Sequence, residues 1–431
     1  MSEYVVHNRL NIEAECGQSV DMSRSLQEIR REIDRLDQEL QHLVNHRATL
    51  AQEVAQIKLK AGENPAGFYR PEREAHILRE VIARNQGPLS SEVISRIFRE
   101  LMSACLALET PLKVAYLGPE GTYTHAAMNR HFGSFIIEES CPTIESVFQL
   151  VASDQAHYGV VPLENSSEGL IAQTFDALIT SSLQVCGEVH LRINHALLGA
   201  AHLLKPQILL KPQMNEERRH VQSASDLSIS PTIDQLINTQ HIKRIYSHPQ
   251  SFGQCRRWLD RYLPHAEQVM MSSNALAALK TSTEDDAVAI ASEVAGRRYG
   301  LTTLAHHIED QSDNMTRFVM IGRDCPRSSG QDKTMIAIKL NQDQRGRLSH
   351  GLYEPIRPLM EHEIRVVRME SRSTSVMKTD QSASEGDLLL LDLEGHVEDE
   401  KIARALNEVR RHTQELNIIG TYPQPLPIFD C

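Results

Sequence analysis

The stretch Val160-Val161-Pro162-Leu163-Glu164-Asn165-Ser166-Ser167-Glu168-Gly169 decides how the centre of the chain is interpreted. Two β-branched residues and a proline indicate a strand end, and polar residues 164–167 follow in one predicted turn. These residues could cap a helix by accepting hydrogen bonds from its free N–H groups. They could also line the bottom of a pocket for a small polar ligand, because open α/β sheets bind ligands at the carboxyl ends of strands. Alone, the four residues favour the cap; motifs elsewhere in the chain favour the pocket.

Length, charge and cysteine use restrict the class of protein. A chain of 431 residues predicts two to four domains. The net charge of −12 argues against nucleic acid or an acidic membrane as a partner. No apolar run reaches the length of a membrane span, and the polar N-terminus lacks a signal-peptide pattern. Seven scattered cysteines without a Cys-x-x-Cys pair favour free thiols in the cytoplasm over disulfides or zinc.

The first quarter of the chain is predicted to be helical after a flexible tail, residues 1–22. Ser25 and Glu28 can form a capping box, and apolar residues then recur every three or four positions, as in a coiled coil. Arg47 takes a seam position, where a charge is costly unless an anion meets it. A helix of about 35 residues exceeds the width of a small domain, so we expect a second chain to cover its seam. Two further helices are expected from Pro71 and from about Ser91.

From Lys113 to about Arg323, short apolar strands alternate with helices, which predicts an α/β fold with a largely parallel sheet. Residues 201–231 repeat a Leu-Leu-Lys-Pro-Gln pentapeptide and then become polar, so we expect an exposed loop there. Four of the expected strands are Val114–Leu117, Tyr158–Val161, Ile242–Tyr246 and Ala287–Ala291.

Three further motifs accompany the opening stretch in a specific order. They are residues 114–125 (VAYLGPEGTYTH), Ser247-His248-Pro249-Gln250 with Gln254-Cys255, and Asn314-Met315-Thr316-Arg317-Phe318. In this order the set resembles prephenate dehydratase, and residues 25–423 as a whole resemble the bifunctional chorismate mutase–prephenate dehydratase family. The resemblance implies a multidomain fold. Its parts are an all-α mutase domain (23–110), a two-lobed α/β dehydratase domain like periplasmic binding proteins (111–325) and a ferredoxin-like ACT regulatory domain (331–424).

For the dehydratase, the resemblance implies that Thr316 serves the hydroxyl that leaves prephenate. A positioned threonine can donate or relay a proton there, while donors and cations hold the carboxylates. The other residues implied at this site are Glu164, Asn165, Ser166, Ser247, Gln254, Arg317 and Phe318. Arg317 could bind a carboxylate or form a salt bridge, and the sequence leaves both open. The chain is expected to leave the first lobe near His195 and to return near Ser292.

For the mutase, the resemblance implies a dicarboxylate pocket in an intertwined dimer. Glu74 matches the residue that holds the substrate hydroxyl, Glu109 the one facing the ether oxygen, and Cys105 stands where a serine often touches a carboxylate. Taken alone, each cation is better interpreted as lying on a solvated helix face, except Arg47 on the seam, and Glu109 could merely end a helix. The cationic residues implied are Arg30, from the partner chain, and Arg47, Lys58 and Arg73.

The C-terminal segment is predicted to run β-α-β-β-α-β, a ferredoxin-like order. Its strands are expected at about 334–340, 364–369, 388–393 and 418–421, and its helices near 352–361 and 399–415. The order resembles an ACT domain, which implies phenylalanine as an effector. Two motifs match only in part, with Glu363 in place of a usual asparagine; they comprise His350, Gly351, Leu352, Tyr353, Glu370, Ser371 and Arg372.

Together these features predict a bifunctional enzyme that converts chorismate to prephenate and then to phenylpyruvate, as a homodimer or higher homo-oligomer. Neither reaction needs a cofactor or metal, and the spacing of His125, His248, His306 and His307 matches no common zinc pattern, which favours capping or surface roles. Two alternatives stay open. One is a two-lobed solute-binding module, and the other is a catalytically inactive sensor with the same domains.

Overall fold

The computed structural model describes residues 24–62, 69–205, 233–311, 313–340, 348–373 and 387–426. The chain divides into two compact units, Met1–Gly62 and Glu63–Cys431. The expected tail, residues 1–22, and most of the expected loop at 201–231 lie outside the described residues.

In the first unit the described element is the long helix α2, Leu26–Lys60, whose 35 residues match the predicted length. The predicted capping box is present: Glu28 N–H donates to Ser25 Oγ at 3.3 Å, and Ser25 N–H donates to the Glu28 carboxylate at 2.7 Å. The nine apolar seam residues are between 41% and 66% exposed; they are Leu26, Ile29, Ile33, Leu36, Leu40, Leu43, Leu50, Val54 and Ile57. Such a long exposed apolar stripe, interrupted at Arg47, is expected to be covered in the working protein.

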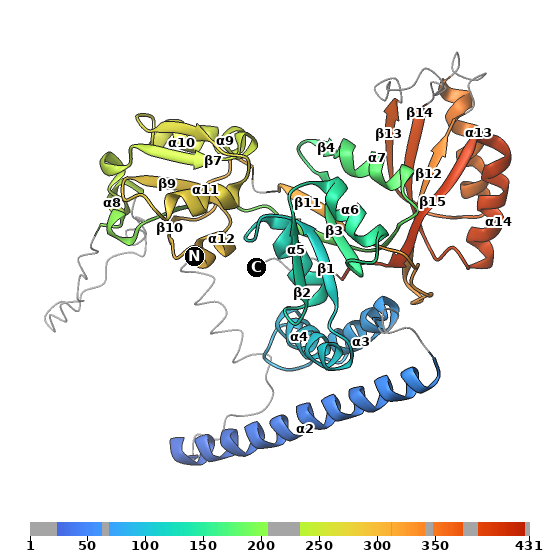
Figure 1. The fold of residues 1–431 in the computed structure, drawn as a ribbon, viewed down its shortest axis with the longest axis horizontal. Coiled ribbons are helices and arrows are strands. Elements are labelled where there is room, and N and C mark those ends of the chain that lie inside the picture. Colours follow the sequence, from blue (N-terminus) through green and yellow to red (C-terminus); the bar gives the residue numbers. More distant parts are fainter. Residues whose placement is uncertain are drawn as a thin grey trace, which may run out of the picture. The chain divides into compact units, whose positions relative to one another are not determined.

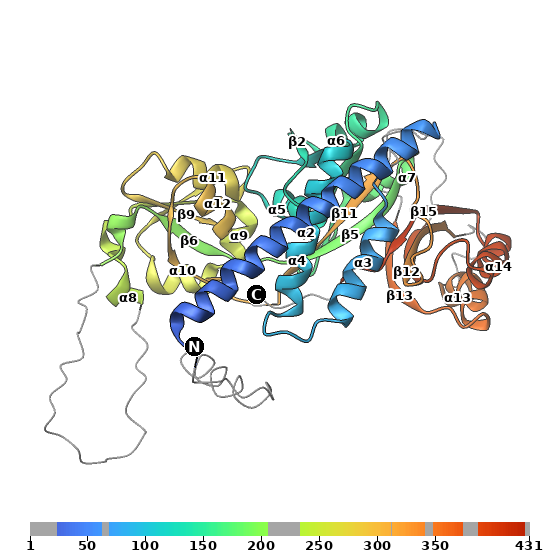
Figure 2. The same ribbon diagram turned by 90° about the horizontal axis from the view of Figure 1, so that it is seen from below.

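The second unit begins with the helices α3, Pro71–Ala83, and α4, Ser91–Glu109, which pack against each other (Figure 2). Pro71 occupies the first turn of α3, as expected for a residue without an N–H to satisfy. The hydroxyl of Ser90 caps α4 by accepting from Val93 N–H at 3.3 Å. Arg79 of α3 donates to the carbonyl of Gln331 at 2.8 Å, so α3 is tied to the segment that leads into the C-terminal domain.

The first α/β lobe is mixed, not largely parallel as expected. Strands β1, β2 and β3 are parallel, but β11 runs antiparallel to both β3 and β5. The reason is that β11 reaches the sheet from the second lobe instead of through a helix on the sheet face. The elements are β1 Lys113–Leu117, α5 Tyr123–Phe132, β2 Ile137–Cys141, α6 Ile144–Ala152, β3 Tyr158–Asn165, β4 Gly169–Leu170, α7 Ala172–Thr180, β5 Gln184–Arg192 and β11 Met315–Gly322.

The second lobe is built on a five-stranded sheet of order β10-β6-β9-β7-β8. Figure 1 labels β7, β9 and β10 of this sheet. The chain enters it after Arg192, close to the expected point. The expected return near Ser292 is wrong, because α12 and β10 still belong to this lobe and the chain crosses between Ala305 and Met315. The elements are β6 Ala196–Gly199, η2 Ala201–Leu203, α8 Ile233–Leu236, η3 Thr239–His241, β7 Arg244–Ser247, α9 Pro249–Gln254, α10 Arg256–Tyr262, β8 Glu267–Met270, α11 Asn274–Thr281, β9 Ala287–Ala291, α12 Glu293–Arg298 and β10 Thr302–Ala305.

The C-terminal domain has the predicted β-α-β-β-α-β order, and its strands pair as β13-β14-β12-β15. The helices α13 and α14 cover one face of this sheet (Figure 1). The predicted second helix was too long: α14 stops at Val409, and Glu415 already pairs with Lys339 as the start of β15. The elements are β12 Asp332–Lys339, α13 Leu348–Glu361, β13 Val366–Ser373, β14 Asp387–Glu394, α14 Glu400–Val409, η6 Arg410–His412 and β15 Glu415–Pro423.

One glycine joins this sheet to the first lobe. Gly420 of β15 pairs with Val185 of β5, and a Cβ at position 420 would lie 2.0 Å from the Val185 carbonyl oxygen. Only glycine permits this approach, which makes the two sheets one 10-stranded sheet. The other face of the C-terminal sheet packs on the apolar core of the first lobe through Met335, Leu390 and Tyr422. The sheet face behind the dehydratase strands is therefore continuous with the C-terminal domain.

Candidate active sites

The strand ends of β3 and β11 bring Asn165 and Thr316 together. The two residues are directly opposite each other in the antiparallel pair, and Asn165 Nδ2 donates to Thr316 Oγ1 at 2.9 Å. Both side chains are buried. The two residues are 151 positions apart in the sequence, so the fold and not the local sequence creates this pair.

A turn of polar residues follows Asn165 and replaces the helix cap that the residues alone favoured. The chain folds back as β4, and α7 starts later, at Ala172, without a side-chain cap. The reason is that Gly169 adopts φ +78°, which turns the chain before a helix can begin. In the turn, Ser166 Oγ accepts from Met315 N–H at 2.9 Å and donates to Asn314 Oδ1 at 3.4 Å. The polar stretch thus faces β11.

Asn314 belongs to this cluster, although we did not predict it as a site residue. Its Oδ1 accepts from Asn165 Nδ2 at 2.9 Å and from Ser167 Oγ at 3.3 Å. The signal was present in the sequence, since Asn314 opens the motif that contains Thr316.

The hydrogen bonds of Asn165 fix the direction in which Thr316 can donate. Asn165 Oδ1 accepts from Ser167 N–H at 3.0 Å, and a backbone N–H can only donate, so the amide NH₂ of Asn165 must face Thr316. The Thr316 oxygen therefore accepts from Asn165. Among the described residues this is the only side-chain hydrogen bond of Thr316, so the hydroxyl proton is available for another acceptor.

Glu164, expected at the same site, faces the opposite side of the sheet. Successive residues of a strand point to opposite faces, so Glu164 and Asn165 cannot both face the cluster. The Glu164 carboxylate, only 5% exposed, forms an ion pair with Arg368 on β13 of the C-terminal domain.

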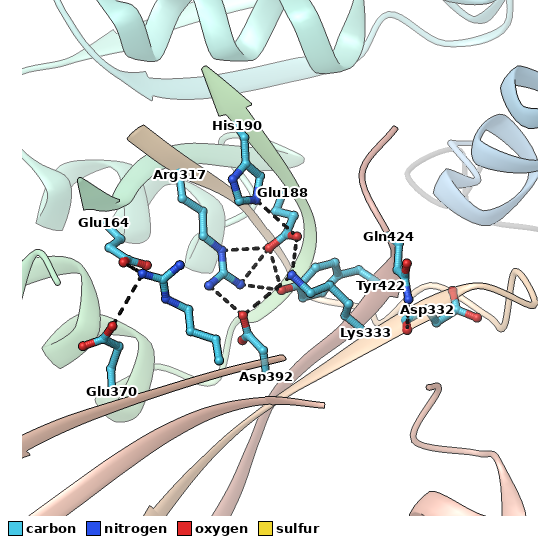
Figure 3. A network of polar contacts seen from close by, with 11 residues as sticks. Glu164, Glu188, His190, Arg317, Asp332, Lys333, Glu370, Asp392, Tyr422 and Gln424 are labelled. Carbon is cyan, nitrogen blue, oxygen red and sulfur yellow. Dashed lines mark hydrogen bonds and ion pairs between the residues drawn. The ribbon is translucent and has the colours of Figure 1, made fainter. Parts of the chain in front are cut away.

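Arg317 likewise points away from Thr316, into a buried ionic network (Figure 3). Its Nη2 lies 2.7 Å from Glu188 Oε2, its Nη1 lies 2.7 Å from Asp392 Oδ2, and it also donates to the Tyr422 hydroxyl at 3.0 Å. With a side chain only 3% exposed, Arg317 forms the salt bridge that was one of its two open alternatives.

The network is held in its charged state by its own members. Burial alone would raise the pKa of Glu188, but the positive charges of Arg317 and Lys333 hold that pKa well below its ordinary value. Lys333 Nζ lies 2.7 Å from Glu188 Oε1. Phe318, expected at the substrate site, is 2% exposed and packs in the core of the first lobe with Val160 and Met320.

Ser247 and Gln254 lie in the second lobe. Ser247 ends β7, is fully buried and donates to Asn274 Oδ1 at 3.1 Å. Gln254 ends α9, and its Oε1 lies 2.8 Å from His195 Nε2 at the entry to the lobe. Between these two residues and the Asn165–Thr316 pair, no hydrogen bond is formed within the described parts of the chain.

The histidines have structural partners. His125 Nδ1 accepts from Gly121 N–H at 3.2 Å, and its Nε2 lies 3.0 Å from Glu138 Oε2. Glu120, His125 and Glu138 bring ligand atoms within 4.8 Å of one another, but both ring nitrogens of His125 already have protein partners. His248 caps α9 by accepting from Gln250 N–H at 3.3 Å. The predicted capping role therefore applies to His248, whereas α5, which contains His125, is capped by Thr122.

The expected mutase residues are divided between the two units. On α2, Arg30 is exposed, while Arg47 and Lys58 are partly buried. In the second unit, Arg73 is exposed on α3, Cys105 is buried in α4, and Glu109 is the last residue of α4 and partly buried.

Glu74 points into a cavity of about 440 Å³ lined by α3, α4, α5, β5 and residues 423–426. Its Oε1 lies 3.6 Å from Arg99 Nε, and its side chain is 16% exposed. Burial raises the pKa of Glu74 to about 7, although the charge of Arg99 acts against the increase. Burial also lowers the pKa of His131, on another wall of this cavity, to about 3.

The expected effector residues take different positions. On β13, Arg372 donates to Asp176 of α7 and to the carbonyl of Ala172, while Glu370 lies 3.5 Å from Arg368. Ser371 is exposed on the opposite face of the strand. Leu352 is partly buried and Tyr353 is exposed in α13, whereas the burial of His350 and Gly351 is not described.

Comparison with known proteins covers nearly the whole chain. Residues 114–326 match the model of the prephenate dehydratase family, and residues 29–110 match that of chorismate mutase type II. The bifunctional chorismate mutase/prephenate dehydratase of Pseudomonas aeruginosa is 38% identical over 402 residues, which are 93% of this chain and 98% of that protein. The chain belongs to this bifunctional family. The Neisseria gonorrhoeae enzyme of the same name is 37% identical, with 93% of this chain and 99% of that protein covered.

Solved structures agree with this membership. The prephenate dehydratase of Arthrobacter aurescens in complex with L-Phe has a TM-score of 0.56 and 26% identity, covering 73% of this chain and 90% of that one. As a bifunctional chorismate mutase–prephenate dehydratase, the protein rearranges chorismate to prephenate and then converts prephenate to phenylpyruvate. In the described residues, no helix combines the length and apolar character that crossing a membrane requires.

The raised pKa of Glu74 predicts a pH-dependent stability for the mutase helices. An acid whose pKa is higher in the folded state is destabilising when ionised, so stability should fall as pH rises from about 4.5 to about 7. The loss should be at most about 3 kcal/mol, and Glu74→Gln should abolish it. Thermal unfolding of both proteins at pH 5 and pH 8 tests this. Glu80→Gln, on the exposed face of α3, is the control, and equal pH dependence in all three proteins would contradict the prediction.

Proposed function

We propose that Thr316 donates the proton to the hydroxyl that leaves prephenate and that Asn165 orients it. The observation that carries this role is the 2.9 Å bond from Asn165 Nδ2 to Thr316 Oγ1, which occupies the oxygen as acceptor and leaves the proton for the substrate. A threonine hydroxyl is a weak acid, but the reaction asks only for a donor held against the leaving oxygen while the ring becomes aromatic.

We propose that Ser166 lies beside this pair and that Ser247 and Gln254 face it from the second lobe. The cleft between lobes is where two-lobed α/β domains take their ligand, which matches the expectation from sequence. Arg317 and Phe318 are not proposed as substrate contacts, because Arg317 already forms ion pairs with Glu188 and Asp392 and Phe318 is a core residue.

For the mutase we propose a pocket for a dicarboxylate made from the residues that match the family's cationic and acidic positions. The rearrangement is pericyclic, so the protein needs only to hold chorismate compactly and to stabilise charge on the ether oxygen. Lys58 and Glu109 are proposed at that oxygen and Glu74 at the substrate hydroxyl. The carboxylates are proposed to be bound by Arg30 from the partner chain and by Arg47, Arg73 and Cys105.

We propose a homodimer as the minimal assembly, supported by the exposed seam of α2. The nine apolar residues of the seam form a stripe along a 35-residue helix, and a second copy of α2 offers the same stripe to cover it. Arg47 lies within that stripe, so the assembly would place a cation where a substrate carboxylate can meet it.

We propose that residues 331–424 are an ACT domain that binds phenylalanine as effector. Two observations support this: the ferredoxin-like order of its strands, and the complex of the similar Arthrobacter aurescens prephenate dehydratase with L-Phe. The proposed mutase and dehydratase boundaries are 23–110 and 111–325. A cytoplasmic location is proposed because the five described cysteines are free thiols.

Incubating the purified protein with chorismate alone tests the bifunctional activity against an inactive sensor. We expect phenylpyruvate to accumulate, detected by its ultraviolet absorption, with no added cofactor. Binding of chorismate without turnover would favour the sensor. Accumulation of prephenate alone would show that the dehydratase does not work.

A further inference from the structure

Behind the Asn165–Thr316 pair, two ion pairs connect the dehydratase strands to the C-terminal domain. Glu164, which precedes Asn165 on β3, pairs with Arg368 of β13, and Arg317, which follows Thr316 on β11, pairs with Asp392 of β14 at 2.7 Å. Each ion pair is therefore one residue away from the proposed catalytic pair. Figure 3 shows Arg317 and Asp392 extending toward each other from the two domains, with Glu164 on the same side as Arg317.

The strand registers place these four charges independently of the ion pairs themselves. Glu164 is the direct partner of Arg317 in the β3–β11 ladder, and Arg368 is the direct partner of Asp392 in the β13–β14 ladder. Directly opposite residues of an antiparallel pair point to the same face. Each ladder thus contributes one positive and one negative side chain, and the ion pairs form between the two ladders. We call Glu164, Arg317, Arg368 and Asp392 the charge quartet.

Three of the four side chains of the quartet are shielded from water. The side chains of Glu164, Arg317 and Asp392 are 5%, 3% and 2% exposed, and only Arg368, at 37%, reaches solvent. Buried charges of this kind hold their geometry tightly, because separating one pair leaves an uncompensated charge in a region of low dielectric. Breaking one ion pair should therefore displace the strand end that carries it.

We propose that Arg368 and Asp392 of the C-terminal domain are positioning residues of the dehydratase reaction. By holding Glu164 and Arg317, they fix the ends of β3 and β11 and so the contact of Asn165 with Thr316. This inference rests on the proposed roles of Asn165 and Thr316. It also gives the C-terminal domain a direct connection to the dehydratase site, because β13 carries Arg368 together with the proposed effector residues Glu370 to Arg372.

The test compares Arg368→Met with Arg365→Met. Arg365 precedes the same strand, is 77% exposed and lies 3.7 Å from Glu394, so its loss is the matched control. With prephenate as substrate, Arg368→Met should lower kcat about tenfold to a hundredfold with KM little changed, because Thr316 is misplaced while substrate contacts stay. Mutase activity on the same samples should be unchanged, and Arg368→Lys should recover most of the lost kcat.

Two further variants separate positioning from general damage. In a Glu164→Gln background, Arg368→Met should lower the dehydratase kcat little further, because the ion-pair partner of Arg368 is already neutral. A full additional loss would overturn the proposal, as would an Arg368→Met protein that matches Arg365→Met. Thr316→Ala is measured beside them. If Thr316→Ala retains full activity, the proposed catalytic role fails; if only Arg368→Met does so, the positioning role alone fails.

Discussion

Replacing Thr316 by alanine should lower the dehydratase kcat by about 10²- to 10⁴-fold, the range for loss of a positioned proton donor. The reason is that Asn165 orients the hydroxyl, whose proton is donated to no other group among the described residues. No neighbouring group therefore replaces this proton donor. KM for prephenate should change little, because the hydroxyl acts on the leaving group and not on the carboxylates. Turnover of added prephenate to phenylpyruvate measures this directly.

Thr174→Ala is the matched control for this variant. Thr174 is fully buried in the same lobe and donates to the Pro162 carbonyl at 2.6 Å, so its replacement also removes a buried threonine hydroxyl. It should cost stability without a comparable loss of kcat. Mutase activity should survive in both variants. Equal dehydratase kcat in the two proteins would show that Thr316 contributes structure and not proton transfer.

Local patterns predicted the elements of this chain well where one pattern dominated. The capping box and the three- and four-residue spacing gave α2 its start and its length. The alternation of apolar segments placed β9 at Ala287–Ala291, as expected. In these cases the residues that decide the structure lie within one or two turns of one another, so short sequence windows contain the needed information.

Long-range packing explains the errors. Ser166 and Ser167 look like a helix cap, but the positive φ of Gly169 and the pairing of β4 with β3 turn the chain back before α7 begins. The return from the second lobe was placed too early because β10 pairs with β6, about a hundred positions upstream, which no local pattern reveals. Motif order identified the family, since it depends on residue types and not on their contacts.

The candidate site shows the same limit at single residues. Asn165 and Thr316 were predicted and lie in contact. Glu164 and Arg317 stand next to them in sequence but face the other side of the sheet, since a strand alternates its side chains. The partners that hold Arg317 come from β5, β14 and β15, so its choice between substrate and salt bridge could not be read from its own motif.

Arg47→Ala should nearly abolish the mutase, lowering kcat/KM for chorismate by about 10²- to 10⁴-fold. A cation on an apolar seam is expected only where an anion meets it, and the proposed anion is a carboxylate of chorismate. Removing the guanidinium leaves that carboxylate buried without its main partner. Dehydratase turnover of added prephenate should stay near the parent value. Arg35→Ala provides the control, because Arg35 is 68% exposed on the same helix and lies 3.9 Å from Glu39.

Mixing two inactive proteins tests whether the pocket spans a dimer. If Arg30 serves the partner's pocket and Arg47 its own, a heterodimer of Arg30→Ala and Arg47→Ala chains has one pocket lacking both residues and one that is intact. Mixed samples that exchange subunits should therefore regain up to about a quarter of the parental mutase activity, since half of the dimers are mixed and each has one working pocket. Exchange without any recovery would place Arg30 and Arg47 in the same pocket of one chain. Recovery in a mixture of Arg47→Ala with itself would show that the assay, and not complementation, produces the signal.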